Sequence, residues 1–322
     1  MTPSTGEIAE PLGAFLGGQV EDLTRLSGGA SRETFSFGLR TASQAVEPLI
    51  MQRVRSGQIV GRFSMESEAS LLRAAALNGV PVAEVVAATN DPSVLGAPFI
   101  VVRRLQGETI ARRILRDGSF ASARSRLIGQ SADALARIHA IDPDTVPELV
   151  AEDQLDALRQ MYDLLEPTMG PHPAFELGFR RLDLSRPPSQ AVSVLHGDFR
   201  LGNLLIDQEG LVAAIDWELA HLGDPMEDLA WFSIRAWTFG GEGEVAGVGS
   251  IDALLSSYER SSGGVVDRGA FQWWRCFETL RWGVICMMQA HAHLSGASRS
   301  VELATIGRRV CETEYDLLRL LR

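Results

Sequence analysis

Five polar residues interrupt an apolar stretch that contains the sequence LHGDFRLGNLL: His196, Asp198, Arg200, Asn203 and, farther on, Asp216. Burying a polar group without a partner costs roughly 2–7 kcal/mol, so residues of these types need partners or a function. An amide and a carboxylate are oxygen ligands that suit Mg²⁺, which takes further ligands from substrate phosphates. Another carboxylate beside the metal can accept a proton from a hydroxyl. The residue types therefore indicate a phosphate-binding magnesium site next to a general base.

A predicted β-hairpin brings these residues together. Residues 202–207 and 211–216 have the pattern of two antiparallel strands joined by Gln208-Glu209-Gly210. The second strand returns beside the loop that precedes the first. We therefore expect Asp198 to act as the catalytic base, with Asn203 and Asp216 as the magnesium ligands.

Other polar residues of this region are expected to support the site. His196 is expected to be structural, bonded to the backbone or to the region of Asp216, and not a metal ligand. Arg200 has two equally weighted roles, pairing with a carboxylate of the following segment or meeting a substrate phosphate or carboxylate. Glu218 either lies beside the metal or makes a structural ion pair. Asp224 and Asp228 are expected to cap or brace the helix that begins near residue 226.

The first hundred residues predict a small β-rich lobe. One amphipathic helix is predicted over 63–79 because apolar residues recur at helical spacing there. Five short β-rich runs separated by turn residues surround it, at 20–26, 33–40, 47–54, 82–89 and 97–105. We expect these runs to form a five-stranded antiparallel sheet with the helix packed on it.

From Gly107 onward the pattern changes to long amphipathic helices, with one β-rich island at 191–216. We place the boundary near Gln106-Gly107, giving a nucleotide-binding lobe over 1–105 and a catalytic and substrate-binding lobe over 106–322. The predicted fold class is α+β, with a small antiparallel β-rich lobe and a larger, mainly helical lobe.

Composition limits the possible partners. The net charge of −11 argues against a nucleic-acid surface. Apolar runs are too short for a membrane helix and the N-terminal residues lack the pattern of a secretory signal, so we expect a cytoplasmic protein without membrane contact. The three cysteines lack metal-binding spacing and are expected to be buried, reduced thiols. The sequence leaves the oligomeric state open.

The spacing of His196, Asp198, Asn203 and Asp216 resembles the phosphoryl-transfer apparatus of protein kinases. The form H-G-D-x-x-x-x-N followed by I-D-W-E, with the later GDPMEDLAW, is similar to the aminoglycoside phosphotransferase and choline kinase superfamily. The subgroup that this chain resembles most includes the kinase domain fused to certain acyl-CoA dehydrogenases. The resemblance implies a two-lobed protein-kinase-like fold that uses ATP, or GTP, with Mg²⁺ to phosphorylate a small-molecule hydroxyl.

The same resemblance assigns nucleotide-binding residues. The segment LSGGASRETFSF looks like the family's glycine-containing loop, so Gly28, Gly29 and Ser31 are expected near the phosphates. The segment APFIVVRRLQGETI looks like its hinge. Val102 and Arg104 are accordingly expected beside the base.

The chain contains no lysine, although kinase-like enzymes place one on the third strand, paired with a glutamate of the following helix. We expect Arg53 to replace it, paired with Glu68. Arg55 is an alternative to Arg53, Glu66 an alternative to Glu68, and an alignment without gaps puts Gln52 at the lysine position instead.

The sequence indicates more than one class of acceptor. The subgroup resemblance favours a hydroxyacyl-CoA or another metabolite, with basic residues supplied by 124–126 or 179–186. An aminoglycoside or macrolide antibiotic is the alternative, because the acidic larger lobe would attract a polycation. A non-catalytic nucleotide-binding module and a metal-dependent hydrolase are competing classes, the latter expected to show clustered histidines.

Overall fold

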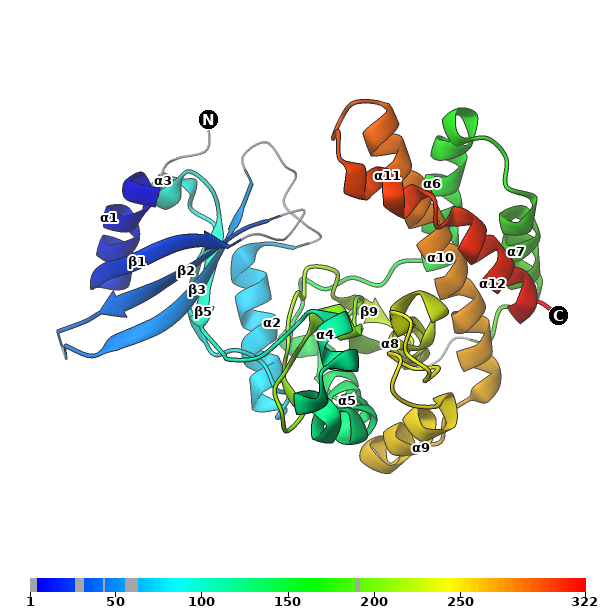
Figure 1. Cartoon of the computed structure of the whole chain (residues 1–322), viewed down its shortest axis with the longest axis horizontal. Helices are drawn as coiled ribbons and strands as arrows, with labels where there is room; N and C mark the ends of the chain where they lie inside the picture. The colour runs from blue at the N-terminus through cyan, green and yellow to red at the C-terminus, as the bar shows by residue number, and fades with distance from the viewer. Residues whose placement is uncertain (1–4, 27–31, 43, 56–62, 189–191) are drawn as a thin grey trace.

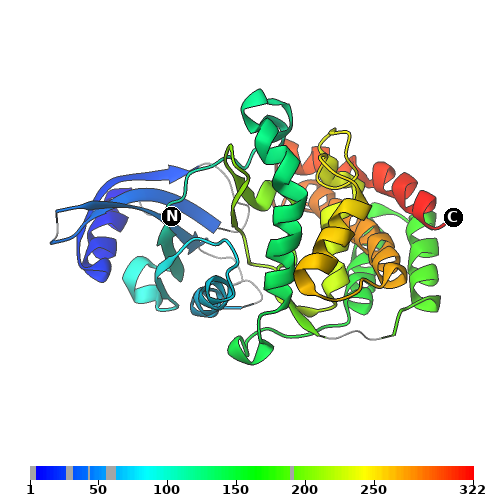
Figure 2. The same cartoon turned by 90° about the horizontal axis from the view of Figure 1, so that it is seen from below.

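The computed structural model describes residues 5–26, 32–42, 44–55, 63–188 and 192–322. It is a mixed α+β protein with a sheet at one end and helices at the other (Figures 1 and 2). The sheet contains β1 (Gln19–Leu26), β2 (Arg32–Arg40), β3 (Val46–Val54), β4 (Val85–Thr89) and β5 (Phe99–Arg103). Its order is β1-β2-β3-β5-β4 and every neighbouring pair is antiparallel. The five-stranded sheet predicted from alternation is confirmed.

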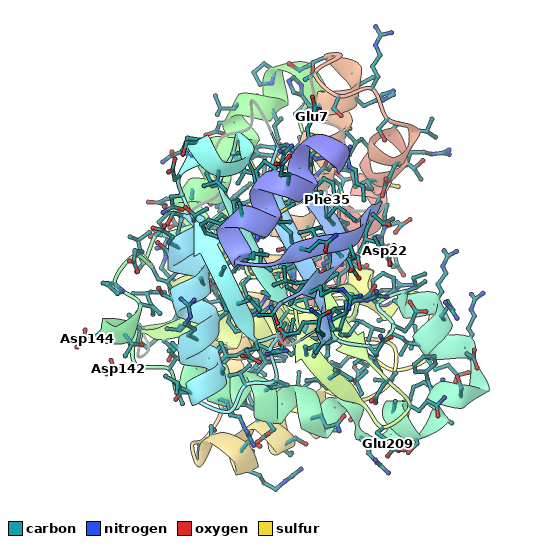
Figure 3. The ribbon with its side chains drawn as sticks, turned by 90° about the vertical axis from the view of Figure 1, so that its left-hand side faces the viewer. Glu7, Asp22, Phe35, Asp142, Asp144 and Glu209 are labelled. Atoms are coloured by element: carbon teal, nitrogen blue, oxygen red, sulfur yellow. The ribbon has the colours of Figure 1, made fainter. Side chains whose placement is uncertain are left out.

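Helices cover the two faces of this sheet differently. Alternate residues of a strand point to opposite faces, and in β2 the face with Phe35, Phe37 and Leu39 packs into a core with α1 (Thr5–Leu16). Figure 3 views this side, with Phe35 labelled beside α1. The short helix α3 (Pro92–Leu95) contributes Leu95 to the same core. The helix α1 was not predicted, since Pro11 lies inside it.

The predicted helix over 63–79 is confirmed as α2 (Met65–Leu77), which packs on the opposite face of the sheet. Ser64 caps its start by accepting a hydrogen bond from the backbone N–H of Ser67. Asn78 caps its end, and Gly79 follows with φ +74°, which glycine adopts without strain.

The larger part of the molecule is mainly helical, as predicted. The long helix α10 (Arg268–Leu294) is its central element, in contact with most of the surrounding helices. The other helices are α4 (Ala111–Arg116), α5 (Ala121–His139), α6 (Gln154–Met169), α7 (Pro173–Leu184), α8 (Pro225–Ser233), α9 (Ile251–Ser262), α11 (Val301–Gly307) and α12 (Val310–Leu320). No helix within the described ranges is long and apolar enough to cross a membrane. Two cysteines are buried, whereas Cys311 is exposed, so the prediction of burial is wrong for that residue.

Two short two-stranded sheets lie among these helices. The strands β6 (Ser193–Leu195) and β9 (His221–Gly223) pair, and β7 (Leu204–Ile206) pairs with β8 (Leu211–Ala214). The predicted hairpin is therefore real but shorter, because 201–203 form a 3₁₀ turn and Asp216 lies past the end of β8. The segment linking the sheet to the helices crosses this hairpin, where Glu108 and Ile206 exchange backbone hydrogen bonds of 2.8 and 3.0 Å. The lobe boundary at 105/106 stays a prediction.

Candidate active site

The loop between β6 and β7 is held by a buried carboxylate from α8. Asp228 accepts hydrogen bonds from the backbone N–H groups of His196 at 2.8 Å and Gly197 at 2.9 Å, and lies 3.2 Å from His139 Nε2. Burial alone would raise the pKa of Asp228, but the hydrogen bond and charge of His139 hold it below the usual value. Asp224 caps α8 as predicted. Asp228 instead braces the loop.

We expect Asp228→Asn to lower the free energy of unfolding by about 3 kcal/mol, because the amide leaves buried backbone donors unpaired. Ser250→Ala is the control, since it removes the N-cap of α9 and should cost only about 1 kcal/mol. Urea unfolding measures both values. Equal effects of the two substitutions would contradict the bracing role.

The carboxylate of Asp198 is fixed by three side-chain donors. It accepts hydrogen bonds from Arg200 Nε at 3.0 Å, Asn203 Nδ2 at 2.7 Å and Trp231 Nε1 at 2.7 Å. The side chain is 14% exposed. The three bonds hold the carboxylate in one orientation, as a group that receives a proton from a bound hydroxyl requires.

Arg200 pairs with Asp198, which precedes it, and not with a carboxylate of the following segment. Its guanidinium carbon lies 5.0 Å from the centroid of the Trp237 ring. Trp237 comes from the 3₁₀ turn η4 (Arg235–Thr238). Arg200 therefore connects the loop to η4.

His196 is structural, as the sequence indicated. It is fully buried, and its Nδ1 accepts a 3.3 Å hydrogen bond from the backbone N–H of Asp198. The rings of Phe199 and Trp217 enclose it at centroid distances of 5.6 and 4.7 Å. Burial lowers the pKa of His196, which keeps the ring neutral and able to accept this bond.

Asp216 lies beside the same loop. The backbone N–H of Ile215 donates to the carbonyl of Asn203 at 2.9 Å, so the end of the hairpin touches the turn that carries Asn203. Asp216 has φ +67°, an unfavourable conformation for a side chain other than glycine. Burial, with the charges of Glu218 and Asp198, raises the pKa of Asp216 to about 6.

These donors fit Mg²⁺. Asn203 and Asp216 supply an amide and a carboxylate oxygen, and magnesium requires few protein ligands because it retains water and phosphate oxygens. Crowding of Asp216 by other carboxylates is relieved by a cation, in keeping with its raised pKa. Within the described ranges, no group of three or more His, Cys, Asp or Glu could hold a metal ion. The clustered histidines expected of a hydrolase are accordingly not found there.

The predicted pair of Arg53 with Glu68 is wrong. Arg53 is buried and donates to Glu33 Oε2 at 2.6 Å and to the carbonyl of Leu95 at 2.8 Å. Leu95 belongs to the core on the α1 side of the sheet, whereas α2 lies on the opposite side. Because the side-chain period of a strand is two residues, Arg53 points away from α2 and the neighbouring Gln52 points towards it.

Glu68 has a different arginine as its partner. Arg32, the first residue of β2, donates to both of its oxygens, at 2.8 and 2.6 Å. Glu218 lies 3.4 Å from Arg32 Nε. Glu68 and not Glu66 therefore occupies the paired position, because Glu66 contacts Asn90.

The remaining nucleotide-binding predictions stay predictions. Gly28, Gly29 and Ser31 lie outside the described residues. Val102 is half-buried at the sheet face that includes α2. Arg104 donates from its side chain to Ser36 Oγ at 3.2 Å.

A pocket of about 810 Å³ lies in the helical part of the molecule. It is lined by residues of α4, η4, α10 and the α11–α12 region. Trp231, which bonds Asp198, contacts Trp237 at a centroid distance of 5.0 Å, and Trp237 contacts Trp282 at 4.6 Å. Trp282 lines the pocket. Three tryptophans in contact, Trp231, Trp237 and Trp282, thus connect the predicted base to the pocket.

The charge of this pocket is positive, unlike that of the whole chain. Its charged lining residues are Arg112, Arg116, Arg235, Arg309, Glu312 and Asp316. Arg235 pairs with Asp316 at 2.9 Å and Arg309 with Glu312 at 3.1 Å. Of the three arginines of α4, Arg113 pairs with Glu108 at 2.6 Å. Within the described residues, no carboxylate is paired with Arg112 or Arg116, which both line the pocket. These two therefore carry the excess positive charge.

The basic segments predicted for an anionic acceptor are mostly engaged elsewhere. Arg124 donates to backbone carbonyls at the end of α4, Arg126 pairs with Glu209, and Arg186 pairs with Asp153. The arginines of the pocket come instead from α4, η4 and the start of α12.

Comparison with known proteins identifies relatives of this chain. The model of the phosphotransferase enzyme family matches residues 22–263. Acyl-CoA dehydrogenase family member 10 of Mus musculus is 29% identical over 235 residues, which are 68% of this chain and 21% of that protein. Acyl-CoA dehydrogenase family member 11 of Homo sapiens is 24% identical over 217 residues, 58% of this chain and 26% of that protein. The chain thus spans about a quarter or less of these relatives.

Solved structures share the fold. A protein of Ralstonia eutropha JMP134, assigned only provisionally to the aminoglycoside phosphotransferases, aligns with a TM-score of 0.78 at 22% identity, covering 97% of both chains. Spectinomycin phosphotransferase APH(9)-Ia, in complex with ADP and spectinomycin, aligns with a TM-score of 0.72 at 13% identity, covering 98% of both chains. A choline/ethanolamine kinase family protein of Mesorhizobium loti aligns with a TM-score of 0.61 at 18% identity, covering 93% and 90%.

Proposed function

Because the chain belongs to the phosphotransferase enzyme family, we propose that it transfers the γ-phosphoryl group of ATP, or GTP, to a hydroxyl of a small molecule that carries negative charge. The observation that carries the proposal is the fixed carboxylate of Asp198. Three donors orient it, and the loop that holds it also contains Asn203 beside Asp216. Phosphoryl transfer depends mainly on such positioning and on charge stabilisation.

In the proposed reaction, Asp198 orients the acceptor hydroxyl and accepts its proton as the hydroxyl oxygen attacks the γ-phosphorus. The bond between that phosphorus and the β–γ bridging oxygen breaks, and ADP leaves. Asn203 and Asp216 would hold Mg²⁺, which neutralises charge on the phosphates. Asp228 and Trp231 keep the loop and its carboxylate in place.

The charge of the pocket supports an anionic acceptor over a polycationic antibiotic. The two arginines of α4 that lack carboxylate partners attract phosphate or carboxylate groups and repel ammonium groups. The likeness to the acyl-CoA dehydrogenase family members adds a hydroxyacyl-CoA as the first compound to test. Aminoglycosides and macrolides form the alternative class, and a non-catalytic nucleotide-binding module is the second alternative.

The proposal is tested by measuring Mg²⁺-dependent ADP release from ATP and from GTP with a panel of acceptors. The panel contains hydroxyacyl-CoAs, aminoglycosides, macrolides, choline and sugar alcohols. Turnover with an anionic acceptor supports the proposal. Turnover with an aminoglycoside alone contradicts the acceptor class. Nucleotide binding without turnover on any acceptor favours the non-catalytic module.

The arginines of α4 give a sharper prediction. We expect the double substitution Arg112→Gln/Arg116→Gln to raise KM for the anionic acceptor about tenfold or more, since charged hydrogen bonds contribute about 1.5–3 kcal/mol each. KM for ATP should not change. The matched control is Arg268→Gln, which removes an exposed arginine paired with Asp252 on the surface. Steady-state kinetics with each substrate varied in turn measure both constants, and an equal rise in both values of KM would contradict the prediction.

A further inference from the structure

We infer that Arg32 on β2 is the residue that binds the nucleotide phosphates, in the role that kinase-like enzymes give to a lysine on the third strand. This inference rests on the proposed function and names the cation that it requires. The role demands a positive charge that faces α2, pairs with its glutamate and lies near the magnesium ligands. Among the described residues of β2 and β3, Arg32 meets all three requirements.

The third strand offers no cation on the required face. Its residues Leu49, Met51 and Arg53 share the face packed against α1 and α3. Gln52 lies on the α2 face, and it is neutral. Arg55 follows the end of the strand, where its Nε lies 3.4 Å from the backbone carbonyl of Arg32. The strand that carries the cation in related folds therefore cannot supply it from within its own bounds.

Arg32 lies where that cation is needed. Its guanidinium makes a two-pronged pair with Glu68 of α2. On its other side Nε approaches Glu218, two residues past Asp216. Arg32 therefore touches the small lobe's helix and the segment that carries the predicted magnesium ligand, and its side chain is only 8% exposed. A guanidinium keeps its charge when buried and matches phosphate oxygens with several donors.

Side chains at position 32 on β2 and position 52 on β3 reach the same place. In the β2–β3 register, Thr34 is opposite Gln52 and Arg32 is opposite Val54. Despite this offset, Arg32 Nη1 lies 3.3 Å from Gln52 Oε1. A long side chain at position 52 can thus reach the same place as the guanidinium. In this protein the cation comes from β2, whereas kinase-like enzymes supply it from the third strand, but the charged group lies in the same place.

The inference is tested by comparing Arg32→Gln with Arg40→Gln for binding of ADP and of adenosine, by calorimetry with Mg²⁺. Arg40 is a matched control because it lies at the other end of β2 and also makes a two-pronged pair, with Glu21. We expect Arg32→Gln to weaken ADP binding about ten- to a hundredfold. Adenosine binding should change little, since adenosine has no phosphates, and Arg40→Gln should leave both affinities near those of the wild type.

A second variant tests whether a cation at position 52 can replace Arg32. Arg32→Gln/Gln52→Lys returns a cation to the third strand, and we expect it to regain ADP affinity to within about tenfold of the wild type. Melting temperatures identify loss of folding, and if Arg32→Gln does not fold, the double variant is compared with the wild type alone. Failure of that folded double variant to bind ADP would then overturn the inference.

The outcomes separate the inference from the proposed function. A wild-type protein that binds no nucleotide refutes both. Wild-type binding of ADP with unchanged affinity in Arg32→Gln refutes the role of Arg32 alone. Equal losses of affinity for ADP and adenosine in Arg32→Gln also refute it. A residue that binds the phosphates should affect the binding of ADP but not that of adenosine.

Discussion

Asp198→Asn is expected to lower kcat by about 10²- to 10⁴-fold, because the amide cannot accept the proton of the acceptor hydroxyl. Affinity for ADP with Mg²⁺ should change little, since the proposed metal ligands are Asn203 and Asp216. Asparagine has nearly the same size as aspartate. The loop that is held by contacts of residue 198 with Arg200 and Trp231 should therefore be retained. Steady-state ADP release with the acceptor found in the panel, together with calorimetric titration of ADP, measures both effects.

Glu209→Gln is the matched control for this experiment. Glu209 lies in the turn between β7 and β8, so it belongs to the same hairpin region, and it makes an exposed pair with Arg126. Removing an exposed pair costs about 0–1 kcal/mol, so turnover should be retained. A residual activity of Asp198→Asn above about a tenth of the wild type would exclude a role for Asp198 as the base.

The sequence predicted those features of the site that depend on local spacing. The hairpin brings Asn203 and Asp216 together because few residues separate them, and turn chemistry constrains the return of the second strand. The antiparallel sheet was predictable for the same reason, since alternation over each strand shows which face is buried. Such signals are contained within a dozen residues.

The sequence predicted neither the contact of Trp231 with the site nor the bracing of its loop by Asp228, because both partners are distant in the sequence. Asp228 and Trp231 both lie in α8 and bond a loop about thirty residues earlier. Every residue from Met226 to Ser233 is buried, so periodicity gives no polar face from which to orient the helix. The available signal was the charge itself, because an aspartate in a wholly buried helix requires a partner.

The error at Arg53 has a simple geometric cause. The charge of Arg53 and its place in a strand do not show which face of the sheet its side chain joins, and a shift of one residue reverses that face. In the structure, Leu49 and Met51 share the face of Arg53, in the core on the α1 side. Nothing in a single sequence shows that Arg32, on another strand, can reach Glu68.

The net charge of the chain and the charge of the pocket differ in sign. The total of −11 for the whole chain favours a polycation as a partner, yet the pocket that the tryptophans connect to Asp198 is lined by more arginines than carboxylates. Charges on remote surfaces are screened over about 8–10 Å, so the proposal of an anionic acceptor rests on the groups that line the pocket and not on the net charge.

Asp216 has a strained backbone conformation and lies close to other carboxylates, and its raised pKa predicts that stability depends on pH. Its pKa is about 6 in the folded protein and 3.8 in the reference state, because of burial and the charges of Glu218 and Asp198. A raised carboxyl pKa means that the folded state binds more protons. This contribution to stability is therefore lost as the pH rises from about 4 to above 6. In the absence of metal, ionised Asp216 should cost the fold about 3 kcal/mol at neutral pH.

Asp216→Asn is therefore expected to raise the free energy of unfolding by about 3 kcal/mol in metal-free buffer near pH 7.5, with a smaller gain near pH 5. The same variant should lose the stabilisation that Mg²⁺ with ADP gives to the wild type, and turnover should fall by about 10²-fold or more. Urea unfolding at the two values of pH and thermal melting with Mg²⁺ and ADP measure these effects. Asp252→Asn, which removes an exposed charge paired with Arg268, should change neither. A metal-free Asp216→Asn protein that is less stable than the wild type would show that the aspartate serves the fold, whereas greater stability with lost Mg²⁺ response identifies a residue retained for binding the metal.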